Sequence, residues 1–188
     1  MKALILFLSV FLSVLSPVNC QSGLTISVGL TMAFTDNPAT NPSGELISGF
    51  HGGLNGRFGS NKWYFRPGIE LHKVKLHSEN LVNPFSEIPS AYFLKVPAQL
   101  GLRLIKTENF VFRILGGFQF SYLVSIQDND FFLDHDTMTD TQIGALIGAG
   151  IDLGPLVIDF NFEKGLSELY KNLGYKSDYI YLSAGFLF

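Results

Sequence analysis

Residues 178–188, with the sequence DYIYLSAGFLF, decide the fold because they alternate between two kinds of position up to the last residue. On an extended strand, successive side chains point to opposite faces. One face of this segment then carries apolar side chains alone, which are Ile180, Leu182, Ala184, Phe186 and Phe188. An apolar stripe that ends in aromatic residues is typical of a barrel strand that faces lipid. We therefore interpret the segment as the closing strand of a membrane β-barrel.

Seven earlier segments show the same alternation, with an apolar set on one face of each. They are residues 24–34, 46–58, 63–73, 91–104, 110–123, 141–152 and 156–164. Short connections (59–62, 105–109 and 153–155) alternate with long ones (35–45, 74–90, 124–140 and 165–177). Short turns at one end and long loops at the other are typical of outer-membrane barrels. The sequence predicts an all-β protein, an eight-stranded antiparallel up-and-down transmembrane β-barrel among outer-membrane lipids, with both termini in the periplasm.

The composition agrees with a single membrane-embedded domain. Charged residues make up 15% of the 188 residues, against about 25% in ordinary globular chains. Lys2, the apolar residues 3–15 and Pro17 are typical of a secretory signal peptide, so we assign residues 1–20 to that signal and 21–188 to the barrel domain. The whole chain has 13 basic and 16 acidic residues, and the signal contributes only Lys2, which leaves 12 against 16. This net charge of −4 excludes a basic nucleic-acid surface.

Cys20 is the single cysteine, so the chain has no internal disulfide. Val18 and Cys20 fit a cleavage site that leaves Gln21 as the first residue. In the alternative interpretation, Cys20 is the lipidated first residue of a lipoprotein. After residue 20, no apolar run approaches the roughly 18 residues of a membrane helix, so a membrane-spanning chain would have to cross as strands.

Aromatic residues on the apolar faces gather near both ends of the predicted strands. Two such groups are expected to mark the two membrane interfaces. The group near the short turns comprises Phe58, Trp63, Phe65, Phe110, Phe112, Phe186 and Phe188, and the group near the long loops comprises Phe34, Phe50, Tyr92 and Tyr122.

Two prolines, Pro67 and Pro97, fall inside predicted strands. Proline cannot donate a ladder hydrogen bond, and a closed barrel has no free edge to accommodate it. We expect a bulge or a missing ladder bond near each proline.

The opposite faces of the strands carry charges of both signs. An eight-stranded barrel is so narrow that side chains fill it, and a lone buried charge is costly, so opposite charges should pair. We predict a structural network that plugs the lumen, with a selective ion path as the alternative. The glycine-rich residues 144–150 are expected to ease packing there. The network comprises Arg57, Arg66, Glu70, Lys95, Arg103, Arg113, Asp152, Asp159 and Glu163.

Two other groups of residues bear on chemistry. Ser48 and His51 raise the alternative of a lipid-modifying hydrolase, but three residues apart on a strand they point to opposite faces. A catalytic His51 would need a partner from another strand. The third long loop is interpreted as a solvated acidic loop, with divalent-cation binding as the alternative; its acids are Asp128, Asp130, Asp134, Asp136 and Asp140. We predict no catalytic residue, no cofactor and no metal site.

Several motifs resemble the PorT-like outer-membrane β-barrel family of Bacteroidetes. They are the Tyr-Phe-Leu-Lys-Val-Pro segment at 92–97, Gly-Ala-Gly-Ile-Asp-Leu at 148–153, Gly-Leu at 165–166 and the terminal Phe188. The chain differs from the family pattern at Lys95, where an acid is frequent, and at Ser183, where glycine is frequent. The resemblance implies an eight-stranded barrel that the outer-membrane barrel assembly machinery inserts, with Phe186 and Phe188 as the assembly signal. One subgroup of that family is linked to protein secretion.

These observations favour a small non-catalytic barrel with a structural, adhesive or secretion-associated role through its long extracellular loops. An unknown surface or secretion partner would bind those loops. Two alternatives remain open at this point. The first is a secreted lipocalin-like barrel whose apolar face points inward around a ligand, and the second is a lipid-A-modifying enzyme.

Overall fold

The structure is a computed structural model that describes residues 23–35, 47–59, 61–75, 90–127, 138–168 and 176–188. The predicted signal peptide, Cys20 and the acidic residues 128–136 lie outside these ranges. Among the described residues, no helix has the length and apolar character of a transmembrane span.

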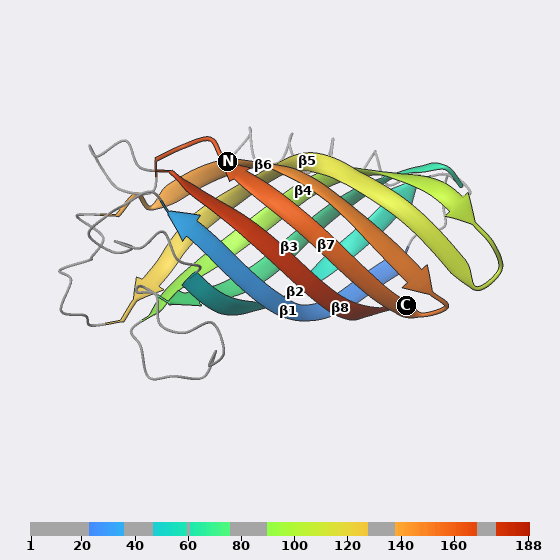
Figure 1. Cartoon of the computed structure of the whole chain (residues 1–188), viewed down its shortest axis with the longest axis horizontal. Coiled ribbons are helices and arrows are strands. Elements are labelled where there is room, and N and C mark those ends of the chain that lie inside the picture. The colour runs from blue at the N-terminus through green and yellow to red at the C-terminus, as the bar shows by residue number, and fades with distance from the viewer. Residues whose placement is uncertain (1–22, 36–46, 60, 76–89, 128–137, 169–175) are drawn as a thin grey trace, which may run out of the picture.

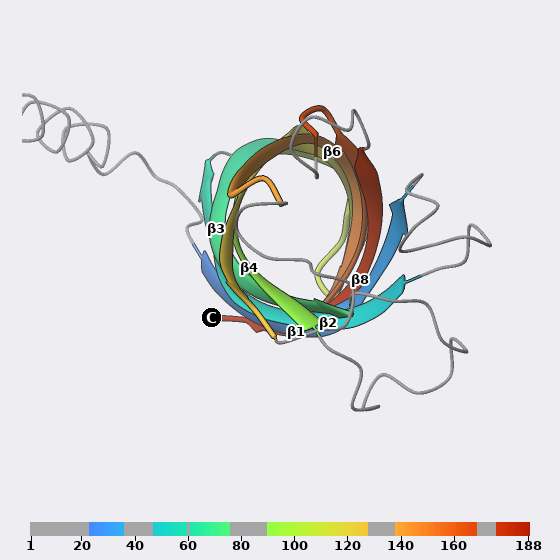
Figure 2. The ribbon, with the colours of Figure 1, turned by 90° about the vertical axis from the view of Figure 1, so that its left-hand side faces the viewer.

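Eight antiparallel strands form a closed barrel, as the alternation predicts (Figure 1). The strands are β1 (Gly23–Thr35), β2 (Ile47–Gly59), β3 (Trp63–Lys75), β4 (Ser90–Lys106), β5 (Phe110–Ile126), β6 (Thr141–Leu153), β7 (Leu156–Gly165) and β8 (Ser177–Leu187). Each strand pairs with its sequence neighbours, and β1 pairs with β8 to close the ring that is visible end-on in Figure 2.

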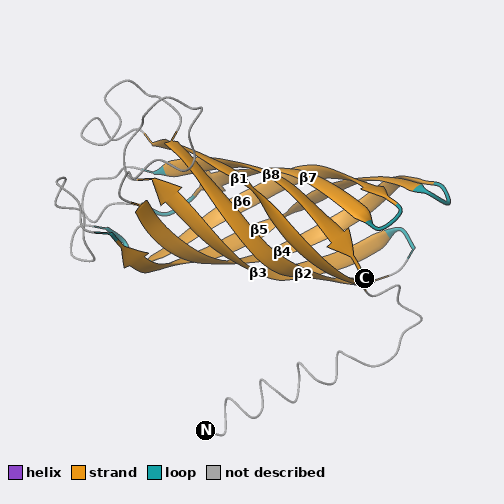
Figure 3. Cartoon of the chain, turned by 90° about the horizontal axis from the view of Figure 1, so that it is seen from below, coloured by secondary structure: helices purple, strands orange, loops and turns teal. Residues whose placement is uncertain are grey.

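The C-terminal segment closes the barrel through its backbone. Ile26 pairs with Phe186, and Leu24 and Phe188 exchange backbone hydrogen bonds of 3.0 and 2.8 Å. Figure 3 shows this end of the chain beside the short turns. We call this the short-turn end of the barrel and the opposite rim the long-connection end. In the turn between β6 and β7, Gly154 has a φ of 61°, a conformation that glycine adopts without a steric penalty.

The barrel exposes its apolar face and buries its polar one. Val28 on β1 is 67% exposed, whereas Lys95 on β4 is 0% exposed. Burying charged side chains while leaving large aliphatic ones on the outside is stable only if lipid surrounds the barrel. The lipocalin-like alternative is therefore wrong, because that fold requires the apolar face to line the interior.

Both prolines interrupt the ladder as expected, without shifting its register. Between β2 and β3, the pairs that would involve Pro67 and Arg66 are missing, and pairing resumes at Phe65. Between β3 and β4, pairing is interrupted opposite Pro97 and resumes at Lys95. Two register shifts occur elsewhere, between β4 and β5. One of them, at 103–105, lets the consecutive residues Leu104 and Ile105 both be exposed.

The long-connection end of the lumen is filled by apolar side chains, which the alternation of the strands did not predict. We call this cluster the apolar cap. Phe93 and Leu123 belong to it, and both are almost completely buried. Its other members are Ala33, Val74, Ala91, Met138, Leu146, Tyr179 and Tyr181. The interior therefore has an apolar end and a polar remainder.

Candidate functional site

Five charged residues from five strands form a continuous arginine–aspartate chain toward the short-turn end of the lumen. Arg57 on β2 holds Asp152 on β6 with two hydrogen bonds, of 2.7 and 3.0 Å. Arg113 on β5 bridges Asp152 at 3.0 Å and Asp159 on β7 at 2.7 Å. Arg66 on β3 completes the chain at 2.9 Å from Asp159. Bidentate arginine–carboxylate pairs fix both direction and distance, so this chain ties β2, β6, β5, β7 and β3 together.

A glycine on β6 makes room for this chain. A Cβ atom at Gly150 would lie 2.2 Å from Asp159 Oδ1 and 2.6 Å from Arg113 Nη1. Any larger residue at position 150 would therefore displace the ion pair. The sequence-based expectation that residues 144–150 ease packing in the lumen agrees with this contact.

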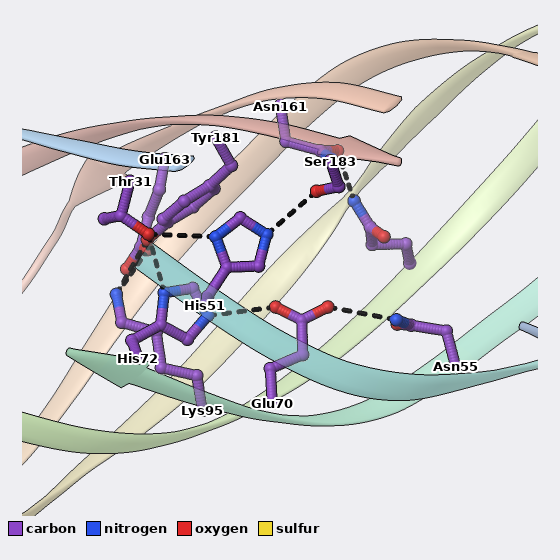
Figure 4. A network of polar contacts seen from close by, with 11 residues as sticks. Thr31, His51, Asn55, Glu70, His72, Lys95, Asn161, Glu163, Tyr181 and Ser183 are labelled. Atoms are coloured by element: carbon purple, nitrogen blue, oxygen red, sulfur yellow. Dashed lines mark hydrogen bonds and ion pairs between the residues drawn. The ribbon is translucent and has the colours of Figure 1, made fainter. Parts of the chain in front are cut away.

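A second group, the histidine network, lies in the middle of the lumen (Figure 4). His51 Nδ1 is 2.9 Å from Thr31 Oγ1, and its Nε2 is 2.9 Å from Ser183 Oγ. His72 Nδ1 is 3.2 Å from the same Thr31 oxygen, and its Nε2 is 3.0 Å from Glu70 Oε2. The two imidazole rings stack with their centroids 4.7 Å apart. Residues from β1, β2, β3 and β8 are thereby joined across the closure of the barrel.

Lys95 connects the apolar cap to the histidine network through Tyr181, whose ring lies edge-on to both imidazoles. Its ammonium donates to Glu163 Oε2 at 2.9 Å and to the Tyr181 hydroxyl at 2.7 Å, and it lies 3.8 Å from the centre of the Tyr179 ring. The Tyr181 hydroxyl also donates to Glu163. On the same two strands as Lys95 and Glu163, Gln99 donates to Asn161 at 3.0 Å. A fully buried ammonium is tolerated here because a carboxylate, a hydroxyl and an aromatic face surround it.

Two of the predicted charged residues have contacts that the simple pairing of opposite charges did not predict. Arg103 is only half-buried at the short-turn end, where it donates to the Asn61 carbonyl at 3.1 Å and stacks 4.6 Å from the centre of the Tyr64 ring. Glu70 contacts His72 and, at 3.1 Å, the amide of Asn55.

Sequence reasoning did not include several residues that the structure brings into the interior. Thr31, Tyr179 and Tyr181 all contact the buried groups described above, and Ser183 was considered only for its place in the C-terminal strand. Each lies at an inward position of its strand. A polar or aromatic residue at an inward-facing position of a predicted strand is the signal that could have identified them.

The predicted aromatic residues lie on the outer face near the two ends of the strands. Trp63 and Phe65 are exposed beside the short turns, and Phe50 and Tyr122 are exposed toward the long-connection end. The remaining members are exposed or partly exposed on the same face, namely Phe34, Phe58, Tyr92, Phe110, Phe112, Phe186 and Phe188. Other outward aromatics, such as Phe118, lie between the two groups.

The pair of Ser183 and His51 has the spacing of a nucleophile and its general base. Both residues line a groove of about 790 Å³ on the outer wall, but inside the lumen there is little room for a substrate. The internal cavity bordered by both residues and by Glu70 has a volume of about 10 Å³, which corresponds to a single water molecule. The carboxylate of Glu70 contacts His72 rather than His51. Within the described residues, no group of three or more His, Cys, Asp or Glu side chains is arranged to hold a metal ion.

Comparisons with known proteins agree on the fold. Residues 20–171 match the family described as outer membrane protein beta-barrel domain. No curated protein matches the chain.

Three solved structures of outer-membrane proteins are similar to this chain. The outer membrane enzyme PagL has a TM-score of 0.56 at 10% identity, with 87% of this chain and 98% of PagL covered. OprG from Pseudomonas aeruginosa has a TM-score of 0.50 at 12% identity, with 90% and 97% covered. Ail, the attachment invasion locus protein of Yersinia pestis, has a TM-score of 0.47 at 18% identity, with 89% and 99% covered. At these identities the likeness concerns the fold and does not extend to activity.

Proposed function

The chain belongs to the outer membrane protein β-barrel domain family, and on this basis we propose that it is a non-catalytic barrel whose long connections carry its role. That role is structural, adhesive or secretion-associated. In the proposed orientation, the long connections face the cell exterior and both termini lie in the periplasm. Residues 1–20 act as the signal peptide, and residues 21–188 form the mature domain. The outer-membrane barrel assembly machinery inserts the chain, with Phe186 and Phe188 as its recognition signal.

The observation that carries this proposal is the filled lumen. The arginine–aspartate chain, the histidine network and the apolar cap follow one another along the barrel. Among the described residues, the cavity between these groups has a volume of about 10 Å³, which supports a lumen closed to ions. A plugged barrel of this width has no channel to offer, so interactions with partners fall to the connections at its rim.

Conductance across a planar lipid bilayer tests the plug. The wild-type protein should give no stable single-channel steps. A pull-down from the cell surface with the intact protein in mild detergent, compared with a variant whose connections are shortened, tests the role of the loops. Steady conductance by the wild type, or equal recovery of partners with both forms, would contradict the proposal.

The PorT-like resemblance supports the secretion-associated form of this role. Its motif at residues 92–97 lies in β4, where Tyr92 is on the outer face and Lys95 reaches into the lumen. Secretion of envelope cargo in cells with and without the gene tests this form directly. An unchanged set of secreted proteins would leave the structural or adhesive form.

A hydrolase is the second candidate, because Ser183 Oγ lies 2.9 Å from His51 Nε2. Lipid profiles of cells expressing the wild type, Ser183→Ala or His51→Ala should be identical if the pair is structural. A lipid species that the wild type makes and both variants lose would establish the enzyme. His72→Ala belongs to the same test, because His72 stacks on His51 and contacts the same Thr31 hydroxyl.

A further inference from the structure

A groove of about 790 Å³ crosses the outer wall of the barrel. Its floor follows a row of residues in register across β7, β8, β1, β2 and β3, which lie side by side (Figure 1). The row reads Ile158, Ala184, Val28, Gly52 and Leu71. Two small residues, Ala184 and Gly52, lie among larger aliphatic ones in this lining.

The next row toward the long-connection end provides a cation. Lys73 on β3 is the cross-strand partner of Phe50 on β2 and of Tyr92 on β4. Its ammonium lies 5.8 Å from the centre of the Phe50 ring and 5.6 Å from that of Tyr92. All three residues line the groove, and within the described residues no carboxylate forms an ion pair with Lys73.

Two comparisons within the barrel distinguish this cation. Lys164 also faces outward near the long-connection end, but it is 2.6 Å from Asp178 and thus already neutralised. A second outer-wall hollow of about 440 Å³, lined in part by Trp63, Leu100 and Gly116, has no charged residue in its lining. Among the described residues, the groove at Gly52 thus combines an apolar cleft with a lysine that forms no ion pair.

We propose that this groove binds the lipid A part of lipopolysaccharide. An acyl chain lies along the floor formed by Gly52 and Ala184, and a phosphate contacts the Lys73 ammonium between the two rings. The volume is suited to a lipid chain, and a cation at the level of the headgroups attracts an anionic lipid. Commitment to lipid A rests on the orientation proposed above, which places Lys73 at the outer leaflet, where lipopolysaccharide carries the phosphates.

Native mass spectrometry tests the site with the protein extracted from outer membranes in mild detergent and delipidated. The probes are bis-phosphorylated lipid A and the same lipid after removal of its phosphates. The wild type should bind the phosphorylated form about five- to tenfold more tightly, as expected for one cation near a headgroup. Lys73→Met should abolish this preference, and Lys73→Arg should retain it.

The cleft is tested independently of the charge. A Cβ atom at Gly52 would meet no atom closer than 3.7 Å, and Gly52 lines the groove, so Gly52→Leu should fold while filling it. It should weaken binding of both lipid forms. Gly116→Leu, in the uncharged hollow, and Lys164→Met, at the neutralised lysine, are the matched controls and should bind as the wild type does.

Equal binding of the two lipid forms by the wild type would overturn the proposal, and so would a phosphate preference that survives in Lys73→Met. Heat-modifiable gel mobility shows whether each variant is folded. If Lys73→Met did not fold, the comparison of the two lipids on the wild type would still decide the question. Because this assay reads lipid binding alone, its failure is distinct from a failure of the proposed loop function, which conductance and pull-down report.

Discussion

The two faces of the barrel wall are specified in different ways. On the inner face, Arg113 contacts two aspartates and lies beside Gly150, so its environment is defined atom by atom. On the outer face, residues such as Ile147 and Phe118 contact lipid, which adapts to any apolar shape. The inner face should therefore tolerate few substitutions and the outer face many. Unfolding in urea can be followed through Trp63, the single tryptophan, which lies on the outer wall.

Arg113→Ala should have the largest effect on the free energy of unfolding. The substitution removes one of the two arginines that each of Asp152 and Asp159 contacts. Removing one partner from a buried ion network costs about 3–5 kcal/mol. The measurement is urea unfolding of the protein refolded into lipid vesicles. Arg103→Ala is the control, because Arg103 is half-buried at the short-turn end and should cost clearly less. Equal losses for the two variants would contradict the proposed hierarchy.

A matched pair of leucines compares the apolar cap with the lipid-facing wall. Leu123→Ala should cost about 2–5 kcal/mol, because it leaves a cavity inside the cap. Leu100→Ala removes the same atoms from the outer wall, where lipid fills the space. It should lose only the transfer contribution of about 0.8 kcal/mol per methylene. If the two variants unfolded at the same urea concentration, the cap would not be a packed core.

Two glycines extend the comparison to the backbone. Gly150→Ala should destabilise the barrel by about 1–3 kcal/mol, because its Cβ would overlap Asp159 and force the ion pair to move. Gly52→Ala should change the unfolding free energy by less than about 0.5 kcal/mol, because its Cβ would make only ordinary contacts, at 3.7 Å or more. The same urea titration measures both. If Gly52→Ala lost more unfolding free energy than Gly150→Ala, the prediction that the barrel requires glycine at 150 and not at 52 would be wrong.

The sequence predicted the strands and their two faces better than it predicted the side-chain contacts inside the lumen. The eight strands and their two faces follow from a period of two, because a one-residue error in parity would place Lys95 or Arg57 in lipid. The partners inside the lumen do not follow, because they depend on the stagger and closure of the strands. Ser183 meets His51 only because β8 and β2 both flank β1. The apolar cap was missed for a different reason. In continuous apolar runs such as 91–94 and 122–124, the side chains on one face lie in the cap and those on the other face lie in lipid. Both sets are apolar, so alternation does not distinguish the inner face from the outer one there.

At Phe188, the effect of a side chain on the stability of the folded barrel can be measured separately from its effect on assembly in cells. Its side chain is 76% exposed, while its backbone exchanges hydrogen bonds with Leu24. Phe188→Ala keeps those backbone bonds, so the refolded variant should unfold within about 0.5 kcal/mol of the wild type. In cells, the same variant should show reduced abundance in the outer membrane if the terminal aromatic is the assembly signal. Leu187→Ala, whose side chain belongs to the inner face, is the neighbouring control. Normal abundance of Phe188→Ala would refute the role of the last residue in assembly, whereas a large loss of stability in vitro would show that its side chain supports the closed barrel itself.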